Sequence, residues 1–466
     1  MPLPIVKSDT ITIKKGLDLP IGGVAEKLFT DARSITTYAV KPTDFVGLTP
    51  RLLVEEGDTV TAGDALFCDK NDERIRFTSP VSGQVKAIVR GEKRRLLEVV
   101  VETDFKSAPA RNTPKTSEEI KATMLQCGLW TSLRQRPFGT VANPDDKPKA
   151  IFVSAFSSAP LAPDYDFVMQ GKENLLLKGL EALMQLTEGL VHVCFRPNQG
   201  ITKALDCFVV PPRNDAKRQL EIHYVKGPHP AGNIGTQIAH IDPINKGEVV
   251  WTMNLQDVAV LGELVTTGVY NPEKVIAVAG PNIKNPHYYL VKAGACLAEI
   301  TKTQLLTEDN TKTDRVISGD ILSGTQIAAD GFLGAYDDLV SILPEGDYYD
   351  FMGWLMPGFK KFSFSRTFLS GFLPKMLKWK FDTNTHGDER PLVFTGNFER
   401  VFPFDIYPTQ LIKACIVGDI ELMENLGIYE VEPEDFALCE FIDTSKTDIQ
   451  AIIREALEKL RKEALS

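Results

Sequence analysis

Residues 54–66 read VEEGDTVTAGDAL, and residues 79–83 read SPVSG. The first stretch carries two Gly-Asp pairs between short apolar segments, and such pairs are typical of tight turns between strands. The second stretch indicates another turn, and two more strands, Val85–Val89 and Leu96–Glu102, are expected after it. Residues 1–105 are therefore predicted to form a domain of short strands and turns.

This pattern resembles the barrel-sandwich domain of biotin- and lipoyl-carrier proteins. That family attaches its prosthetic group to a lysine at a hairpin tip upstream of the Ser-Pro turn. The equivalent position falls near Asp72, with Lys70 two residues away, and the flanking residues of an attachment site are missing. Lys70 is therefore interpreted as a solvated turn lysine, and the domain is expected to keep the scaffold without the swinging arm.

The middle of the chain predicts an α/β domain. Residues 106–149 suggest a linker or crossing segment, and residues 150–256 then alternate between strands and helices. Ala150–Phe156 is an apolar strand, and Leu175–Leu186 has the apolar periodicity of an amphipathic helix. Such alternation implies a parallel sheet with crossover helices. Further strands are expected at Leu190–Phe195, Cys207–Val210 and Leu220–Val225.

The remaining sequence divides into three segments. Residues 257–345 return to short strands with glycine turns, and residues 346–390 are rich in aromatic and basic side chains. Residues 391–466 are predicted to be helical, and the last helix begins with a capping-box pattern at Ser445 and Asp448.

Composition restricts the class of protein. The formal net charge is −10, which disfavours nucleic acid as a partner because phosphate contacts need clustered Lys and Arg. The seven cysteines form no CxxC pair, which indicates a reducing compartment and argues against a cysteine-ligated zinc or iron–sulfur site. The sequence shows no signal peptide and no uncharged apolar run near 18 residues, so a cytoplasmic location without a membrane span is expected.

Two loops could bind a ligand. The first, Gly227–Gln237, is rich in glycine and follows an expected strand, so its backbone N–H groups could approach a phosphate. A tight strand-to-helix turn is the alternative. The second loop follows the strand Ala150–Phe156, where open parallel sheets bind ligands, although an ordinary polar loop is equally compatible. The candidate residues are Phe156, Ser157, Ser158, His229, Gly232, Gly235 and Thr236.

Residues 348–381 combine nine Phe and Trp residues with six Lys and Arg residues. This density favours a surface that lies on anionic lipid or on a membrane partner. Burial in a core is the alternative, but the cations make full burial difficult. The docking residues are predicted to be Phe351, Trp354, Phe359, Lys360, Lys361, Phe362 and Trp379.

No catalytic group or metal-ligand spacing can be assigned from the sequence. The six histidines are dispersed, and each is more often structural than catalytic because a titrating role needs a specific neighbour.

Several motifs, taken in order, resemble one family along nearly the whole chain. They are Lys15-Gly16-Leu17-Asp18, Glu56-Gly57-Asp58, Ser79–Gly83, Phe402-Pro403 and Tyr407–Leu411. The family comprises the A subunit of the sodium-translocating NADH:quinone reductase and the C subunit of the Rnf complex, and both resemble the flavin-binding subunit of complex I. The resemblance implies a multidomain α/β and β protein. Its parts would be a barrel-sandwich hybrid, a Rossmann-like α/β domain, a β-grasp, soluble-ligand-binding-like domain, and a helical ferredoxin-like bundle.

The departures from the relatives concern cofactors. The Rnf relatives carry two iron–sulfur cysteine motifs in the helical bundle, and one thiol here cannot hold a cluster. The flavin-binding relatives have an acidic loop after the first strand, whereas Ser154–Leu161 contains no carboxylate. The positions that correspond to the cluster cysteines are Leu392, Thr395, Phe398, Phe402, Pro433, Phe436, Cys439 and Asp443.

The resemblance therefore implies a peripheral protein of a respiratory complex, on the cytoplasmic face of the bacterial inner membrane and without a tightly bound redox cofactor. The implied complex oxidises NADH, reduces ubiquinone and exports Na⁺, with FMN, riboflavin, FAD and iron–sulfur centres held by other subunits. The membrane-embedded B subunit is the chief partner implied, and ubiquinone could contact this chain. The alternatives are a free NADH- or flavin-dependent oxidoreductase and an assembly or ligand-binding scaffold.

Overall fold

The computed structural model describes residues 3–202, 209–210, 220–305, 314–353, 355–359, 361–372 and 378–464. Two sheets form the predicted N-terminal β domain. The larger joins β3 (Thr37–Val40), β9 (Leu96–Thr103), β8 (Gly83–Arg90) and β5 (Thr59–Val60), and the smaller joins β4 (Pro50–Leu52), β6 (Ala65–Asp69) and β7 (Arg76–Thr78). Gly57 and Gly63 turn the chain with φ of 94° and 90°, a region that favours glycine. Lys70 is exposed, as the sequence predicts.

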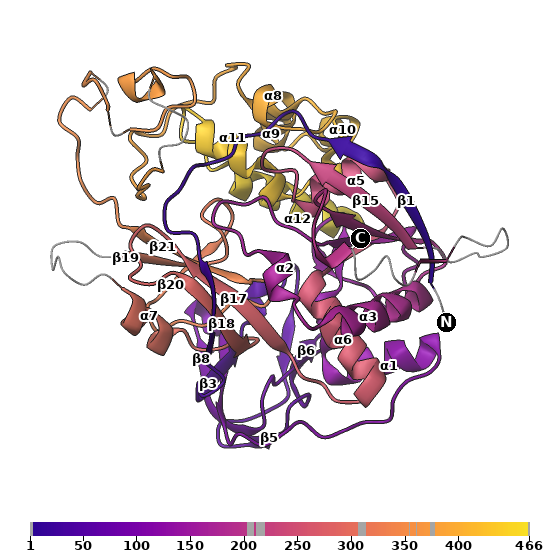
Figure 1. Cartoon of the computed structure of the whole chain (residues 1–466). Coiled ribbons are helices and arrows are strands. Elements are labelled where there is room, and N and C mark those ends of the chain that lie inside the picture. Colours follow the sequence, from indigo (N-terminus) through magenta and orange to yellow (C-terminus); the bar gives the residue numbers. More distant parts are fainter. Residues whose placement is uncertain are drawn as a thin grey trace.

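The second part is an eight-stranded sheet with helices on both faces (Figure 1). Its strand order is β11-β10-β16-β12-β13-β15-β1-β14, and β16, β12, β13 and β15 run parallel, as predicted. The strands are β1 (Leu3–Thr12), β10 (Arg134–Arg136), β11 (Thr140–Val141), β12 (Ala150–Ser154), β13 (Leu190–Phe195), β14 (Val209–Val210), β15 (Leu220–Lys226) and β16 (Val250–Asn254).

Strand β1 departs from the sequence-based assignment. It was expected within the N-terminal β domain of residues 1–105, but it pairs in parallel with β15 and extends the α/β sheet. Local sequence cannot distinguish these two outcomes, because an apolar strand pairs with whichever sheet edge the tertiary fold presents.

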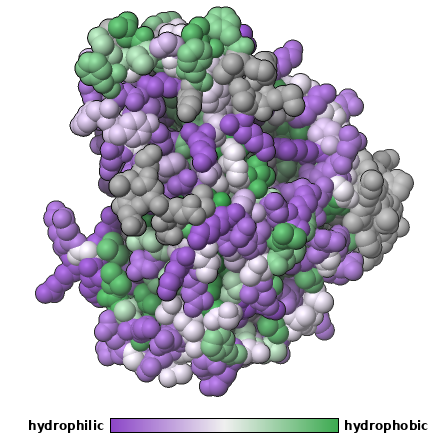
Figure 2. Space-filling view, turned by 60° about the vertical axis from the view of Figure 1, so that its left-hand side comes forward, coloured by the Kyte–Doolittle hydropathy of each residue, from purple (hydrophilic) through white to green (hydrophobic). Residues whose placement is uncertain are grey.

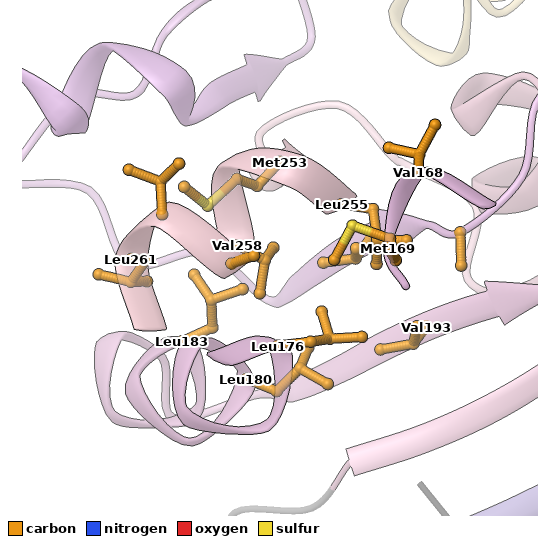
Figure 3. Packing of buried hydrophobic residues seen from close by; sticks show 14 of the residues in the cluster. Val168, Met169, Leu176, Leu180, Leu183, Val193, Met253, Leu255, Val258 and Leu261 are labelled. Carbon is orange, nitrogen blue, oxygen red and sulfur yellow. The ribbon is translucent and has the colours of Figure 1, made fainter. Parts of the chain in front are cut away.

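Helices α1 (Ser117–Cys127), α3 (Glu173–Leu186) and α6 (Leu255–Thr267) cover one face of this sheet, and α5 (Ile234–Ile241) packs on the other. A short helix, α2 (Tyr165–Val168), precedes α3. Figure 3 shows side chains of α3 and α6, including Leu180, Leu183 and Val258, interlocked above the sheet. The two helices approach closely because Gly179 and Gly262 lie at the contact. A Cβ at Gly179 would stand 1.9 Å from the Val258 carbonyl oxygen.

Helix α6 corrects a second expectation, that short strands begin at residue 257. Nearly every residue from Leu255 to Leu264 is buried. A helix buried on all sides shows no apolar stripe, so its periodicity is hidden in the sequence. The predicted β-rich part therefore begins at β17 (Glu273–Ala279).

The third part is a six-stranded sheet in the order β2-β18-β17-β21-β19-β20. Strand β2 (Glu26–Asp31) is supplied by the N-terminal region, so this sheet also joins distant parts of the chain. Its other elements are β18 (His287–Lys292), α7 (Ala298–Gln304), β19 (Asp314–Ser318), β20 (Thr325–Ile327) and β21 (Leu339–Pro344).

The C-terminal part is helical, as predicted, with its own apolar core. Its elements are α8 (Phe398–Val401), α9 (Pro408–Val417), α10 (Ile420–Asn425), α11 (Ala437–Ile442) and α12 (Ile449–Ala464). Asp448, rather than Ser445, caps α12, because its carboxylate accepts from the Ala451 N–H at 3.2 Å. Ser445 Oγ instead donates to the Pro391 carbonyl at 3.1 Å. Likeness to a ferredoxin-type bundle stays a prediction.

Helix α12 has one charged face, and its apolar face is buried in the core of the helical part. Within the described ranges, no helix combines the length and the apolar character that spanning a bilayer requires.

Candidate functional site

The two predicted ligand loops lie side by side beyond the carboxyl ends of the parallel strands. The Gly232 N–H donates to Ser158 Oγ at 2.7 Å, and the same oxygen lies 3.1 Å from His229 Nδ1. Ser154 Oγ donates to the Gly232 carbonyl at 3.2 Å. The sheet therefore brings together residues that are more than 70 positions apart in the sequence.

These loops pack against each other and leave little open space between them. Ser158, His229 and Thr236 are buried. A Cβ at Gly232 would lie 2.3 Å from the Ser158 nitrogen, and one at Gly235 would lie 2.5 Å from a carboxylate oxygen of Asp435. The glycines here accommodate close packing, which favours the tight-turn interpretation over a phosphate cradle.

Phe156 and Ser157 differ in their surroundings. Phe156 is buried, and the Arg196 guanidinium lies 5.1 Å from its ring centroid. Arg196 also donates to the Ser157 carbonyl at 3.0 Å, which fixes the loop. Of the two residues, only Ser157 lines the adjacent cleft.

That cleft has a volume of about 360 Å³ and lies where three parts of the chain meet. Ser157 comes from the end of β12 and Asn254 from the end of β16, so the cleft opens where the strand order reverses. Open α/β sheets bind ligands at this position. The sheet of β17–β21 contributes Asp320, and the helical part contributes Glu434.

The cleft is acidic. Its carboxylates outnumber its guanidinium groups, which come from Arg134 and Arg454. Burial raises the pKa of Asp338 to about 6, although the Tyr165 hydroxyl donates a hydrogen bond to it. A phosphate-bearing ligand would face repulsion from this lining. The carboxylates are those of Asp44, Asp320, Asp337, Asp338, Glu432 and Glu434.

A buried ionic cluster closes the inner wall of the cleft. The Arg136 side chain is 3% exposed, and its guanidinium lies 2.7 Å from Glu434, 3.3 Å from Asp435 and 3.4 Å from Glu432. Arg134 pairs with Glu432 at 2.9 Å. Burial raises the pKa of Asp435 to about 7, against the influence of Arg136. Burial acts in the same direction on Glu432, but Arg136 and Arg134 outweigh it and hold the pKa of Glu432 below its ordinary value.

The predicted docking segment is anchored at one side and exposed at the other. Phe362 packs against Phe381 at 5.5 Å and Phe441 at 6.0 Å between ring centroids, and the backbone N–H of Trp379 donates to the Pro20 carbonyl at 2.7 Å. Phe351 and Phe359 are 89% and 60% exposed. Figure 2 shows apolar side chains gathered at the top of the view.

Of the two adjacent lysines in this segment, the structure describes only Lys361. Lys361 is half-buried, forms an ion pair with Asp350 and donates to the Gly353 carbonyl at 3.2 Å. Trp354 and Lys360 lie outside the described residues.

The sequence did not reveal a cluster of His192, Glu221 and His223 on β13 and β15. The two histidines are 31 residues apart, and only the strand register places them together. The available signal was one histidine within the apolar strand Leu190–Phe195 and two polar residues at alternate positions, Glu221 and His223, in the next expected strand.

Three family models match successive parts of the chain. Family models described as the NqrA N-terminal barrel-sandwich hybrid domain, the NqrA second alpha/beta domain and the NQRA C-terminal domain match residues 11–104, 115–270 and 275–329. The solved chain of an NAD⁺-reducing [NiFe]-hydrogenase aligns with a TM-score of 0.37 and 14% identity, over 75% of this chain and 67% of that chain.

Curated relatives match over nearly the full length. The chain is 38% identical to a protein of Yersinia pseudotuberculosis, 39% to one of Pasteurella multocida and 40% to one of Neisseria meningitidis. Each comparison covers 97% of this chain and 100% of the relative. All three relatives are named as the A subunit of a Na(+)-translocating NADH-quinone reductase.

Proposed function

Because the chain belongs to the family of the A subunits of Na(+)-translocating NADH-quinone reductases, we propose that it serves as a peripheral subunit of such a complex on the cytoplasmic face of the membrane. The complex would oxidise NADH, reduce ubiquinone and export Na⁺. The observation that carries this proposal is the 38–40% identity to curated relatives, which extends over 97% of the chain.

The exposed aromatic segment supports docking onto the membrane subunits, chiefly the B subunit. Phe351, Phe359 and Phe372 are exposed by 60% or more and lie in one segment of the chain, and apolar side chains that gather on a surface mark interaction sites. Phe362 and Trp379 hold the segment against the rest of the protein through a ring contact with each other and a backbone hydrogen bond from Trp379 to Pro20. Burial of two phenylalanines at an interface contributes about 3–6 kcal/mol, which is enough to decide binding.

The docking test compares variants of the full chain in cells that carry the remaining subunits. F351D/F359D is expected to move the chain from the membrane fraction to the supernatant. The matched control is F105D, since Phe105 is 61% exposed but lies outside this segment. Equal membrane retention of F351D/F359D and F105D would reject the docking surface.

The packing of the helical part supports the absence of an iron–sulfur cluster on this chain. Phe398, Phe402, Phe436 and Cys439 occupy positions aligned with cluster cysteines, and all four are buried in one apolar core. The rings of Phe402 and Phe436 lie 4.7 Å apart, so side chains fill the space that a cluster would need. The purified chain is expected to contain no stoichiometric iron or flavin, and a bound flavin would instead favour a free oxidoreductase.

The acidic cleft is our candidate for contact with ubiquinone. Its donors Asn254, Gln450 and Arg454 could bind quinone carbonyls, and a neutral headgroup avoids the repulsion that a phosphate would meet. A photoreactive ubiquinone analogue should label peptides containing Ser157, Asn254 or Gln450 in the intact complex. Labelling confined to other subunits would reject this contact.

A further inference from the structure

A cluster of two imidazoles and one carboxylate lies on one side of the α/β sheet, away from the acidic cleft. In the register of β13 and β15, His192 pairs with Glu221, and His223 follows two residues later on the same side of its strand. His192 Nδ1 lies 2.9 Å from His223 Nε2. The Glu221 carboxylate oxygen lies 3.6 Å from each of these nitrogens.

The three atoms have the spacing of ligands around one ion. Metal–ligand bonds of about 2.1 Å place tetrahedral ligands about 3.4 Å apart. The separations of 2.9, 3.6 and 3.6 Å bracket that value, so an ion could bind without rearrangement of the strands. Two histidines with one glutamate are also a donor set that Zn²⁺ uses in proteins.

The surroundings prepare both imidazoles for ligation. Both imidazoles are buried, with His192 3% and His223 5% exposed. His223 Nδ1 lies 2.8 Å from Ser8 Oγ, a partner that would fix the ring with Nε2 facing the site. The ring of His192 stacks on Phe152 with centroids 4.5 Å apart.

His192 directs its polar interactions toward the cluster. Its side chain is 3% exposed, and its Nε2 has no hydrogen-bond partner among the described residues. Nδ1 is therefore the ring atom through which it interacts. The Glu221 side chain is 27% exposed, which leaves an entry path and a position for water as a fourth ligand.

We propose that His192, Glu221 and His223 form a binding site for a divalent transition metal of the Zn²⁺ class. The ion would join β13 to β15 and, through Ser8, to β1, the strand next to β15 in this sheet. The site lies outside the acidic cleft and outside the docking segment.

The test measures metal binding to the purified full chain after dialysis against a chelator. Titration with Co²⁺, followed by its visible absorption and by competition with Zn²⁺, should give one tight site for each chain. H192Q and E221Q should weaken this site by more than about 100-fold, and S8A by about 10- to 100-fold, as expected for an outer partner. Zinc should also raise the thermal midpoint of the wild type and leave that of E221Q unchanged.

Two controls separate the site from other metal binding. H386Q alters an exposed histidine far along the chain and should bind Co²⁺ like the wild type. Binding by cysteine thiols would persist in E221Q, because that variant changes no thiol. If H192Q fails to fold, E221Q decides, since Glu221 is partly exposed and Gln keeps its shape. The proposal is overturned if the wild type takes up no stoichiometric metal, or if E221Q and H192Q bind as tightly as the wild type.

Discussion

Replacement of Arg136 by methionine should selectively destabilise the junction between the α/β sheet and the helical part. Methionine replaces the aliphatic stem of the side chain but removes the guanidinium that faces Glu432, Glu434 and Asp435. Glu432 retains Arg134 at 2.9 Å, so Asp435 is the group most affected. Removal of one partner from a buried ion pair costs about 3–5 kcal/mol.

Hydrogen exchange is the suitable assay, because a chain of several domains does not unfold in one transition. The Glu432 amide donates to Asp435 Oδ2 at 2.9 Å and reports on this junction. Its protection should fall roughly 10²- to 10⁴-fold, the equivalent of about 3–5 kcal/mol. The loss should shrink from pH 8 to pH 6, because Asp435 can then take up a proton.

The control is R33M, at a comparable but exposed ion pair. Arg33 contacts Asp31 at 2.7 Å and Glu273 at 3.2 Å, and its side chain is 47% exposed. Exposed pairs contribute about 1 kcal/mol or less. If protection at Glu432 in R136M changes no more than protection near Arg33 in R33M, the reasoning about buried charge is refuted.

Three further predictions concern other residues. D435N should flatten the pH dependence of stability at this junction. The pKa of Asp435 is about 7 in the folded chain and about 3.9 when unfolded, so the stability that its proton contributes is lost as pH rises through this range. An unchanged pH dependence of amide exchange at Glu432 would contradict this. G179A should destabilise the α/β part by about 1–3 kcal/mol, because its Cβ would clash with the Val258 carbonyl, while K178A on the same helix should change stability by less than about 0.5 kcal/mol, both measured by amide exchange in α3 and α6. S154A should loosen the contact between the two loops, because Ser154 Oγ accepts from the Gln237 side chain at 2.9 Å and shares its hydrogen between the Phe156 and Gly232 carbonyls, and amide exchange at residues 232–237 should rise about tenfold.

Sequence patterns predicted the parts of the fold that alternate clearly between polar and apolar residues. The strands β8, β9, β12, β13 and β15 and the helices α3 and α12 fall in this class, since each buries one face or follows a strong apolar run. Helix α6 was not predicted, because a helix buried on all sides shows no apolar stripe in the sequence. Strands β1 and β2 were misplaced because their partners lie more than 180 residues away.

The candidate site could be predicted only in outline. The rule that ligands bind beyond the carboxyl ends of parallel strands pointed to Ser157, which lines a cleft, but the residues that give the cleft its charge come from distant segments. Glu432 and Arg134, for example, are almost 300 positions apart, and neither belongs to a recognisable motif. Gly232 and Gly235 show a second reason. A phosphate-binding loop and a close contact between two loops both require glycine, so the residue type alone could not distinguish them.

The central claim is that this chain works as a docked subunit of a Na⁺-translocating NADH:quinone reductase. The most direct measurement is affinity purification of the tagged chain from mildly solubilised native membranes, with assay of NADH:quinone activity at varied Na⁺. The account predicts recovery of flavin-bearing membrane subunits and Na⁺-dependent activity, both lost with F351D/F359D and retained with F105D. Recovery of the wild-type chain alone from the soluble fraction, without a reductase, would contradict it.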